Sequence, residues 1–306
     1  MGEVRTGSGK PTITRGAFGQ HGLTWAAVAS KVRRVRFPIL RFGVVPVVDG
    51  PTFRADLSRV CRALGYYLGT TVECRPLPTY AKLVTLLSQA QIDAAWVPPV
   101  VAMDCGARRI ARPRIAMVRQ RETAYHAVLF TLRDSPIRSL ADLQKVRAAW
   151  VSPDSASGYL VPLASLRARG VSLSKAFADQ IFVGTHEAVA RAVAEGKAQV
   201  GASFAHFGPA DPRVPVSASW IESKVEADFR ILLAAGPIPT DVIAMHRTMD
   251  EGHQQALISA FGWLVTRPEA AAANAIFRCD GFEGCGDEHL RGLRKLIRLL
   301  DRPSMC

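Results

Sequence analysis

The chain has 306 residues with a formal net charge of +13, and 48% of its residues are hydrophobic. This length and apolar content suffice for two folded domains and exclude a disordered chain. The charge is uneven, because residues 1–41 hold eight basic residues and one acidic residue, Glu3. The rest of the chain is only mildly basic, which argues against a nucleic-acid surface on the folded part.

Residues 1–38 are expected to form a basic leader with little regular order. The segment Ala27-Val28-Ala29 resembles the small-residue cleavage site of a secretory signal, but Gln20 and His21 interrupt the apolar stretch before it. The sequence therefore leaves export and a cytoplasmic location both open.

The six cysteines form no Cys-x-x-Cys pair and no cluster with zinc spacing, so no metal site is predicted. Cys61 falls on the apolar stripe of a predicted helix and is interpreted as a small core residue. Cys279 and Cys285 are close enough in sequence to form a disulfide, although the sequence cannot establish one.

From residue 39 onward, the hydrophobic pattern alternates between strand and helix. Apolar runs predict strands at 39–47, 71–75 and 92–97, with helices at 53–68 and 80–90 between them. This β-α-β-α-β order is typical of a parallel sheet covered by helices.

A second unit of similar plan follows. Strands are predicted at 126–132, 148–151, 181–183, 200–204, 229–235 and 242–245, and helices at 139–142, 158–169, 187–195, 250–265, 268–277 and 288–300. Two α/β units of this kind make a cleft lined by turns at strand ends.

The most informative stretch runs from Trp150 to Pro162, where a strand passes through a serine-rich turn into a helix. Ser155 and Ser157 stand at capping positions, and Gly158 would let the backbone approach a bound group closely. Free N–H groups and the positive end of the helix dipole suit an oxyanion. A serine that only caps the helix is the simpler alternative.

No Walker loop, dinucleotide-binding glycine pattern or Ser-His-Asp order occurs, so neither a cofactor nor an enzyme activity is predicted. Proton transfer by His186 and Asp241 in the cleft would be an enzymatic alternative, but no nucleophile–base pair can be identified.

The chain resembles the periplasmic phosphate/phosphite/phosphonate-binding proteins of ABC importers over residues 40–300. The resemblance lies in five blocks that occur in the family's order: Leu40-Arg-Phe-Gly-Val-Val-Pro46, Tyr80-Ala-Lys-Leu-Val84, Gln91-Ile-Asp-Ala-Ala-Trp96, Pro153-Asp-Ser-Ala-Ser-Gly-Tyr-Leu-Val-Pro162, and Gly184-Thr-His-Glu-Ala-Val-Ala-Arg-Ala-Val-Ala-Glu-Gly196. It implies an α/β, two-lobed type 2 periplasmic-binding-protein fold with a ligand cleft between lobes.

The implied lobes are 39–128 plus 238–306 and 129–237, joined by hinge strands near 125–131 and 232–239. The resemblance also implies a monomer that passes its ligand to an ABC permease. A cytoplasmic sensor with the same fold, whose basic leader touches a partner, nucleic acid or an anionic membrane, is the alternative.

By position, the residues that bind the phosphonate head group in the family correspond to a set shared among several turns. These are Tyr80, Ser155, Ala156, Ser157, His186 and Asp241.

Three positions depart from the family pattern. Ala156 replaces a threonine, Val97 stands where members that bind 2-aminoethylphosphonate have a tyrosine, and His206 stands where they have a glutamate. Because histidine cannot pair with an ammonium group as a carboxylate does, the sequence favours phosphate, phosphite or a simple phosphonate as the ligand.

Overall fold

The structure is a computed structural model that describes residues 39–46, 50–208, 211 and 214–298. The predicted basic leader, its signal-like segment and Cys306 lie outside these residues.

The first sheet has the strand order β12-β4-β11-β3-β1-β2. Strand β1 pairs in parallel with β2 and β3, whereas β11 runs antiparallel to β3 and β4. The strands are β1 (Leu40–Val44), β2 (Val72–Pro76), β3 (Ala94–Val97), β4 (Ala111–Val118), β11 (Val242–His246) and β12 (Gly281–Gly284).

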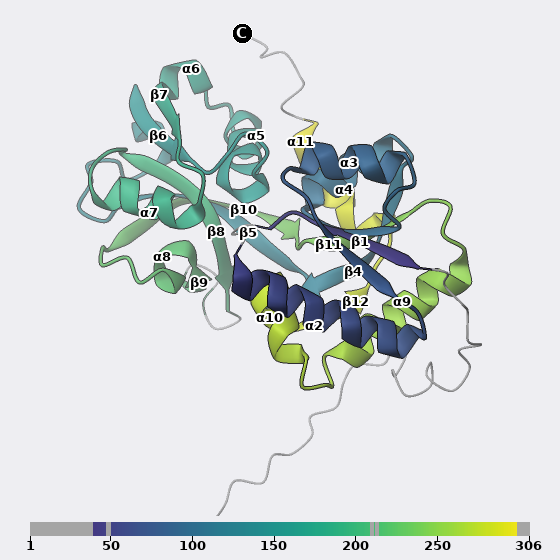
Figure 1. Ribbon diagram of the computed structural model, residues 1–306. Coiled ribbons are helices and arrows are strands. Elements are labelled where there is room, and N and C mark those ends of the chain that lie inside the picture. Colours follow the sequence, from purple (N-terminus) through teal and green to yellow (C-terminus); the bar gives the residue numbers. More distant parts are fainter. Residues whose placement is uncertain (1–38, 47–49, 209–210, 212–213, 299–306) are drawn as a thin grey trace, which may run out of the picture. The chain divides into compact units, whose positions relative to one another are not determined.

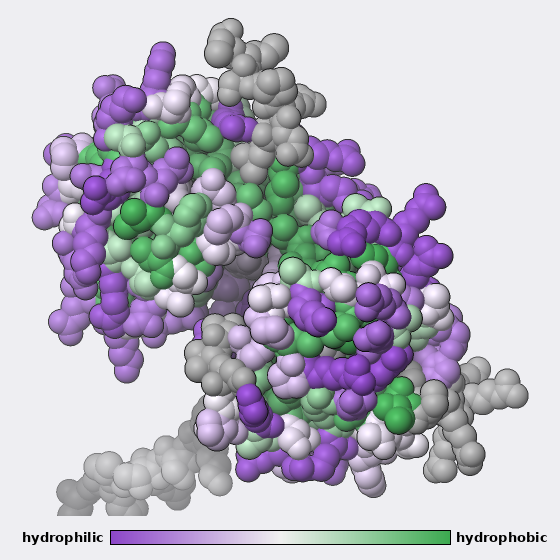
Figure 2. Space-filling model, turned by 45° about the horizontal axis from the view of Figure 1, so that its top comes forward, coloured by the Kyte–Doolittle hydropathy of each residue, from purple (hydrophilic) through white to green (hydrophobic). Residues whose placement is uncertain are grey.

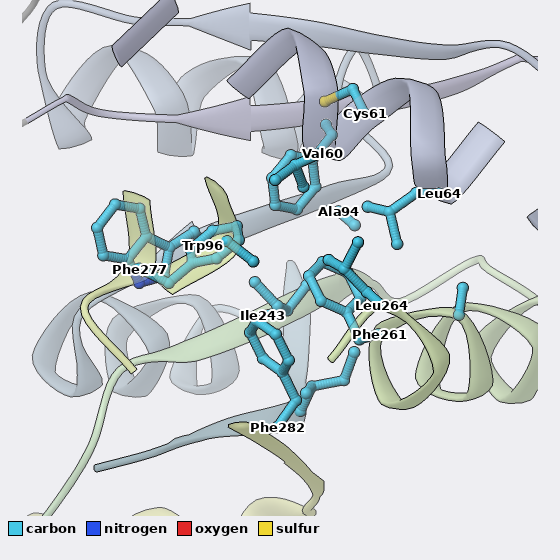
Figure 3. Packing of buried hydrophobic residues seen from close by; sticks show 14 of the residues in the cluster. Val60, Cys61, Leu64, Ala94, Trp96, Ile243, Phe261, Leu264, Phe277 and Phe282 are labelled. Atoms are coloured by element: carbon cyan, nitrogen blue, oxygen red, sulfur yellow. The ribbon is translucent and has the colours of Figure 1, made fainter. Parts of the chain in front are cut away.

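Helices cover both faces of this sheet (Figure 1). They are α2 (Pro51–Leu68), α9 (Glu251–Leu264) and α10 (Ala270–Phe277) on one face, and α3 (Tyr80–Ser88) and α4 (Pro99–Ala107) on the other. Successive residues of a strand point to opposite faces. Ala94 and Trp96 of β3 therefore pack with α2, α9 and α10, while Ala95 and Val97 pack with α3 and α4. Figure 3 shows Trp96 beside Phe277 in the first of these cores.

The second sheet has the order β10-β5-β8-β6-β7, with β9 paired to β8. Strands β6 and β7 are parallel, and β5 is antiparallel to both β8 and β10. The strands are β5 (Ala124–Leu132), β6 (Val146–Trp150), β7 (Phe177–Phe182), β8 (Val200–Phe207), β9 (Pro215–Ala218) and β10 (Phe229–Pro239).

This sheet also buries both faces (Figure 1). One core contains Ala148 and Trp150 with α5 (Val161–Ala168) and α6 (Leu173–Ala176), and the other contains Ala149 with α7 (His186–Ala194) and α8 (Ser219–Glu222). A short 3-10 helix spans Leu140–Asp142, within the predicted 139–142, and has a capping box: the Asp142 carboxylate accepts from the Ser139 backbone N–H at 2.8 Å.

Both helix-covered sheets agree with the predicted α/β class. The segments that connect the two sheets bear on the predicted lobe limits. The predicted lobe limits, 128/129 and 237/238, fall inside β5 and β10, which pair with each other from Ala124 to Leu132. After the 3-10 turn Asp287–Leu290, α11 (Arg291–Ile297) packs on α5 and β10, with Leu293 in the core of the second sheet. The lobe limits themselves stay predictions.

The sequence patterns missed several elements. They are α4, β4, α6, β9, α8 and β12. In β4 the sequence Ala-Arg-Pro-Arg (111–114) contains a proline, which has no N–H for the ladder and argues against a central strand. The strand nevertheless lies between β11 and β12 and is paired on both sides.

The structure pairs cysteines that the sequence did not link, and it does not form the bond that the sequence left open. Cys61 is bonded to Cys74, which ties α2 to β2 across Cα atoms 6.4 Å apart, while Cys279 and Cys285 are free thiols. Cys61 still lies in the core as predicted, but as half of a disulfide.

None of the described helices combines the length and apolar character that crossing a bilayer requires. On the face shown in Figure 2, hydrophobic residues are exposed in patches bordered by hydrophilic ones.

Candidate functional site

A cavity of about 680 Å³ brings together residues from both sheets. Its volume lies within the range of small-molecule sites. The second sheet contributes Tyr125, Phe204 and His206, and the turn before α5 contributes Ser157. The first sheet and its helices contribute a larger set: Pro51, Phe53, Asp56, Trp96, Asp241, Phe277, Arg278 and Asp280.

The two serines of the serine-rich turn have different roles. The Ser155 hydroxyl accepts from the Gly158 backbone N–H at 3.0 Å and so caps the helix. Ser157 is 2% exposed, lines the cavity and is hydrogen-bonded to the side chain of Tyr125. Residues Ala156–Leu160 form a π-helical turn before α5, an irregularity that is frequent at functional sites. The capping alternative therefore applies to Ser155 and not to Ser157.

Gly158 is needed in this turn for close packing. A Cβ atom there would lie 2.4 Å from Cγ2 of Val151, which is closer than any side chain tolerates. The glycine lets the turn pack on Val151, directly after strand β6; the predicted approach to a bound group stays a prediction.

His186 begins helix α7, where Thr185 caps by accepting from Ala188 N–H at 3.1 Å. The Nδ1 atom of His186 lies 2.9 Å from the hydroxyl of Ser203, which is fully buried on β8. Burial lowers the pKa of His186 to about 4, and the Asp241 carboxylate opposes that shift. At neutral pH the imidazole is therefore uncharged. If Ser203 donates to Nδ1, Nε2 carries the hydrogen.

Asp241 occupies the connection between β10 and β11 and is held there by its neighbour. The buried Thr240 hydroxyl donates to the carbonyls of Met117 and Thr123, at 2.5 and 3.1 Å, so it ties this connection to the one between β4 and β5. The Asp241 carboxylate forms an ion pair of 2.7 Å with Arg119.

Arg119 is fixed by three acceptors. Besides Asp241, its guanidinium donates to the carbonyls of Phe277 at 3.1 Å and Arg278 at 2.9 Å, at the carboxyl end of α10. Burial works against the charge of Arg119, but the Asp241 carboxylate outweighs it and holds the pKa above its usual range. The guanidinium is a permanent charge that already has a counter-ion.

The Asp241 carboxylate also acts electrostatically on two tyrosines. Burial and then the Asp241 charge raise the pKa of Tyr125 to about 12, and the same two causes raise the pKa of Tyr80. Both phenols therefore keep their protons at neutral pH and remain donors.

Of the predicted site residues, the cavity brings four together: Ser157, His186, His206 and Asp241. Tyr80 does not line the cavity, although the charge of Asp241 contributes to its raised pKa. Three others lie elsewhere: Ser155 caps the helix, Ala156 is buried in the second sheet's core, and Val97 is fully buried under α3 and α4.

Sequence reasoning missed several residues of the cavity. Arg119 and Tyr125 flank the tight turn between β4 and β5, and the failure to predict β4 hid the turn. Glu222 of α8 also lines the cavity and acts electrostatically on His206. His206 and Trp96, 6% and 7% exposed, each bury a ring nitrogen (Nδ1 and Nε1) that has no hydrogen-bond partner among the described residues.

Among the described residues, no group of three or more His, Cys, Asp or Glu side chains could hold a metal ion. The arrangement offers hydroxyl, imidazole and guanidinium donors around the Asp241 carboxylate.

Residues 42–290 match the sequence model of a family described as the periplasmic phosphonate substrate-binding proteins of ABC transporters. The chain belongs to this family. The match covers both sheets and every predicted site residue, and the members of this family are substrate-binding transport proteins.

Similar individual proteins agree with the family. A phosphate-import protein PhnD of Mycolicibacterium smegmatis is 26% identical over 175 residues, which are 54% of each chain, so the match spans about half of that relative. XAC2383 of Xanthomonas citri, solved with ATP, has a TM-score of 0.66 at 23% identity and covers 87% of this chain and 98% of its own. PhnD1 of Prochlorococcus marinus, solved with methylphosphonate, has a TM-score of 0.65 at 17% identity, with 87% and 99% coverage. The fold is thus the two-lobed type 2 binding-protein fold.

Proposed function

We propose that this protein is a non-catalytic solute-binding protein for a small phosphorus oxyanion: phosphate, phosphite or a simple phosphonate. It would act as a monomer and deliver its ligand to an ABC permease. The observation that carries the proposal is the convergence of Ser157, His186 and Arg119 on one cavity, because these side chains supply donors from both sheets around a space of ligand size.

The decisive experiment is calorimetry with phosphate, phosphite and methylphosphonate. We expect micromolar binding of at least one, which requires about −8 kcal/mol and is within reach of several charge-assisted hydrogen bonds of about 1.5–3 kcal/mol each. Ser157→Ala should weaken that binding about tenfold. Ser155→Ala is the matched control, since its hydroxyl caps the helix outside the cavity; there we expect lower stability but a smaller loss of affinity. No binding of any of the three anions would reject the ligand assignment.

A second ligand class is favoured by Glu222. The sequence argument against 2-aminoethylphosphonate was that His206 replaces a carboxylate, but Glu222 restores one to the same cavity. A carboxylate there can pair with an ammonium group. Titration with 2-aminoethylphosphonate tests this directly: binding that is tighter than methylphosphonate and is lost in Glu222→Gln supports the amino-bearing ligand.

The disulfide favours export over the cytoplasmic sensor. Disulfides form and persist in oxidising compartments and are rare in the cytosol, and Cys61 and Cys74 are bonded. Mass spectrometry of alkylated protein from fractionated cells tests the proposal. We expect the pair to be oxidised in the exported fraction, whereas a reduced pair in a cytoplasmic fraction would support the sensor.

A further inference from the structure

A second cavity, of about 640 Å³, is lined by four arginines and lies outside the site described above. The arginines come from four separate places in the fold: Arg109 follows α4, Arg112 belongs to β4, Arg247 follows β11, and Arg294 belongs to α11. Among the residues that the structure describes, the only carboxylate in its lining is Asp287. The formal charge of the lining is therefore strongly positive.

These guanidinium groups have no ion-pair partner among the described residues, in contrast to many arginines elsewhere in the fold. Arg41, Arg114, Arg119 and Arg191, for example, pair with carboxylates at 2.6–2.9 Å. In the cavity, by contrast, Arg247 donates to the Arg109 carbonyl at 3.3 Å, a contact that orients the side chain without neutralising it.

Gathering like charges around one cavity is unfavourable unless an anion neutralises them. Guanidinium groups present paired donors that match phosphate oxygens two at a time. Several guanidiniums facing one space suit an anion with several linked phosphate groups better than a single tetrahedral ion. The opening is distinct from the cavity that holds His186 and Asp241, because the two share no lining residue.

We propose that this arginine-lined cavity binds a polyvalent anion made of linked phosphates, either free or at the end of a larger molecule. The anion would contact the guanidinium groups of α4, β4, β11 and α11 at once, and so hold the C-terminal helix against the first sheet.

The test is calorimetry with inorganic tripolyphosphate at about 0.1 M salt. We expect binding by the full chain that weakens at least about tenfold in the Arg112→Gln/Arg294→Gln variant. The matched control is Arg59→Gln/Arg191→Gln, which removes the same charge from two exposed arginines that have carboxylate partners elsewhere. Equal losses in both variants would overturn the proposal, because the attraction would then depend on net charge alone.

A second variant should change the affinity in the opposite direction. Asp287→Asn removes the one carboxylate of the cavity, so tripolyphosphate should bind severalfold more tightly, a gain that misfolding cannot produce. Unchanged or weaker binding in this variant argues against the site. A further arm uses His186→Ala: if it abolishes tripolyphosphate binding, the anion occupies the first cavity and the proposal is wrong.

Two comparisons identify the ligand's form. Orthophosphate should bind this cavity more weakly than tripolyphosphate, and equal affinities would reject the linked-phosphate class. If adenosine triphosphate binds with the same affinity as tripolyphosphate, the cavity recognises the phosphate chain alone. If adenosine triphosphate binds more tightly, the cavity also contacts the attached nucleoside.

Discussion

The imidazole of His186 should remain neutral far below the pH at which an exposed histidine gains its proton. Burial disfavours the imidazolium and lowers its pKa to about 4, although Asp241 pulls in the other direction. The hydroxyl of Ser203, 2.9 Å from Nδ1, can satisfy the neutral ring. The folded protein therefore excludes a proton that the unfolded chain accepts.

The sign and size of the effect follow from linkage. Between about pH 6.5 and pH 4 the unfolded chain binds a proton at His186 and the folded chain does not, so the free energy of unfolding falls as the pH falls. At about 1.4 kcal/mol per pKa unit, the difference between 6.5 and about 4 corresponds to at most about 3 kcal/mol. The His186→Gln variant lacks this proton. It should therefore lose less stability than the natural protein between pH 7 and pH 4, by that amount.

Urea unfolding of both proteins at pH 7, 6, 5 and 4 measures the difference, and the other histidines cancel because both chains contain them. Nuclear magnetic resonance of the imidazole reports the pKa of His186 directly, without and with phosphate. A bound anion should raise this pKa, because it stabilises the imidazolium. A His186 resonance that titrates near 6.5 in the ligand-free protein, or identical acid sensitivity of the two proteins, would refute the reasoning.

Three further changes test other parts of the site. Ser203→Ala removes the group that orients the imidazole, so phosphate affinity measured by calorimetry should fall about 3- to 10-fold, and Ser203→Thr should keep most of it. Gly158→Ala places a Cβ against Val151 and should lower the free energy of unfolding in urea by about 1–3 kcal/mol; a Val151→Ala background should recover part of the loss, and simple additivity would contradict the close contact. Asp241→Asn leaves the Arg119 charge without its counter-ion and should cost about 2 kcal/mol in urea unfolding. No loss of stability would show that the carbonyls of Phe277 and Arg278 satisfy Arg119 without Asp241.

The order of strands and helices was predictable from the sequence because most elements follow one period clearly. The apolar spacing of α2 and the short apolar run of β3 each indicate one type of element. Strand β4 was not predictable in this way, since Pro113 cannot donate to a ladder and a proline within a run argues against a central strand. Its place in the sheet depends on pairing with β11 and β12, which are more than a hundred residues away in sequence.

That missed strand explains why Arg119 of the cavity went unnoticed. The turn after β4 carries Arg119, whose partner Asp241 lies 122 residues further along the chain. Local patterns report what a residue is, but not which distant residue faces it. The disulfide shows the same limit: the helical stripe identified Cys61 as buried, and only the packing of α2 on β2 brought Cys74 to it.

The charges of the cavity constrain how an oxyanion of the proposed kind would be held. His186 is neutral and Arg119 is already paired, so Arg278 is the other arginine of the described lining, while Asp56, Glu222 and Asp280 add negative charge. Neutral donors must then make many of the hydrogen bonds to the anion. These donors are the hydroxyls of Ser157 and Tyr125 and the ring N–H of His186. Asp241 can only accept, so it favours a ligand oxygen that still bears a proton, and it discriminates against a fully ionised anion by repulsion. A carboxylate in an anion site thus selects among ligand protonation states, and its ion pair with Arg119 holds it in place for that role.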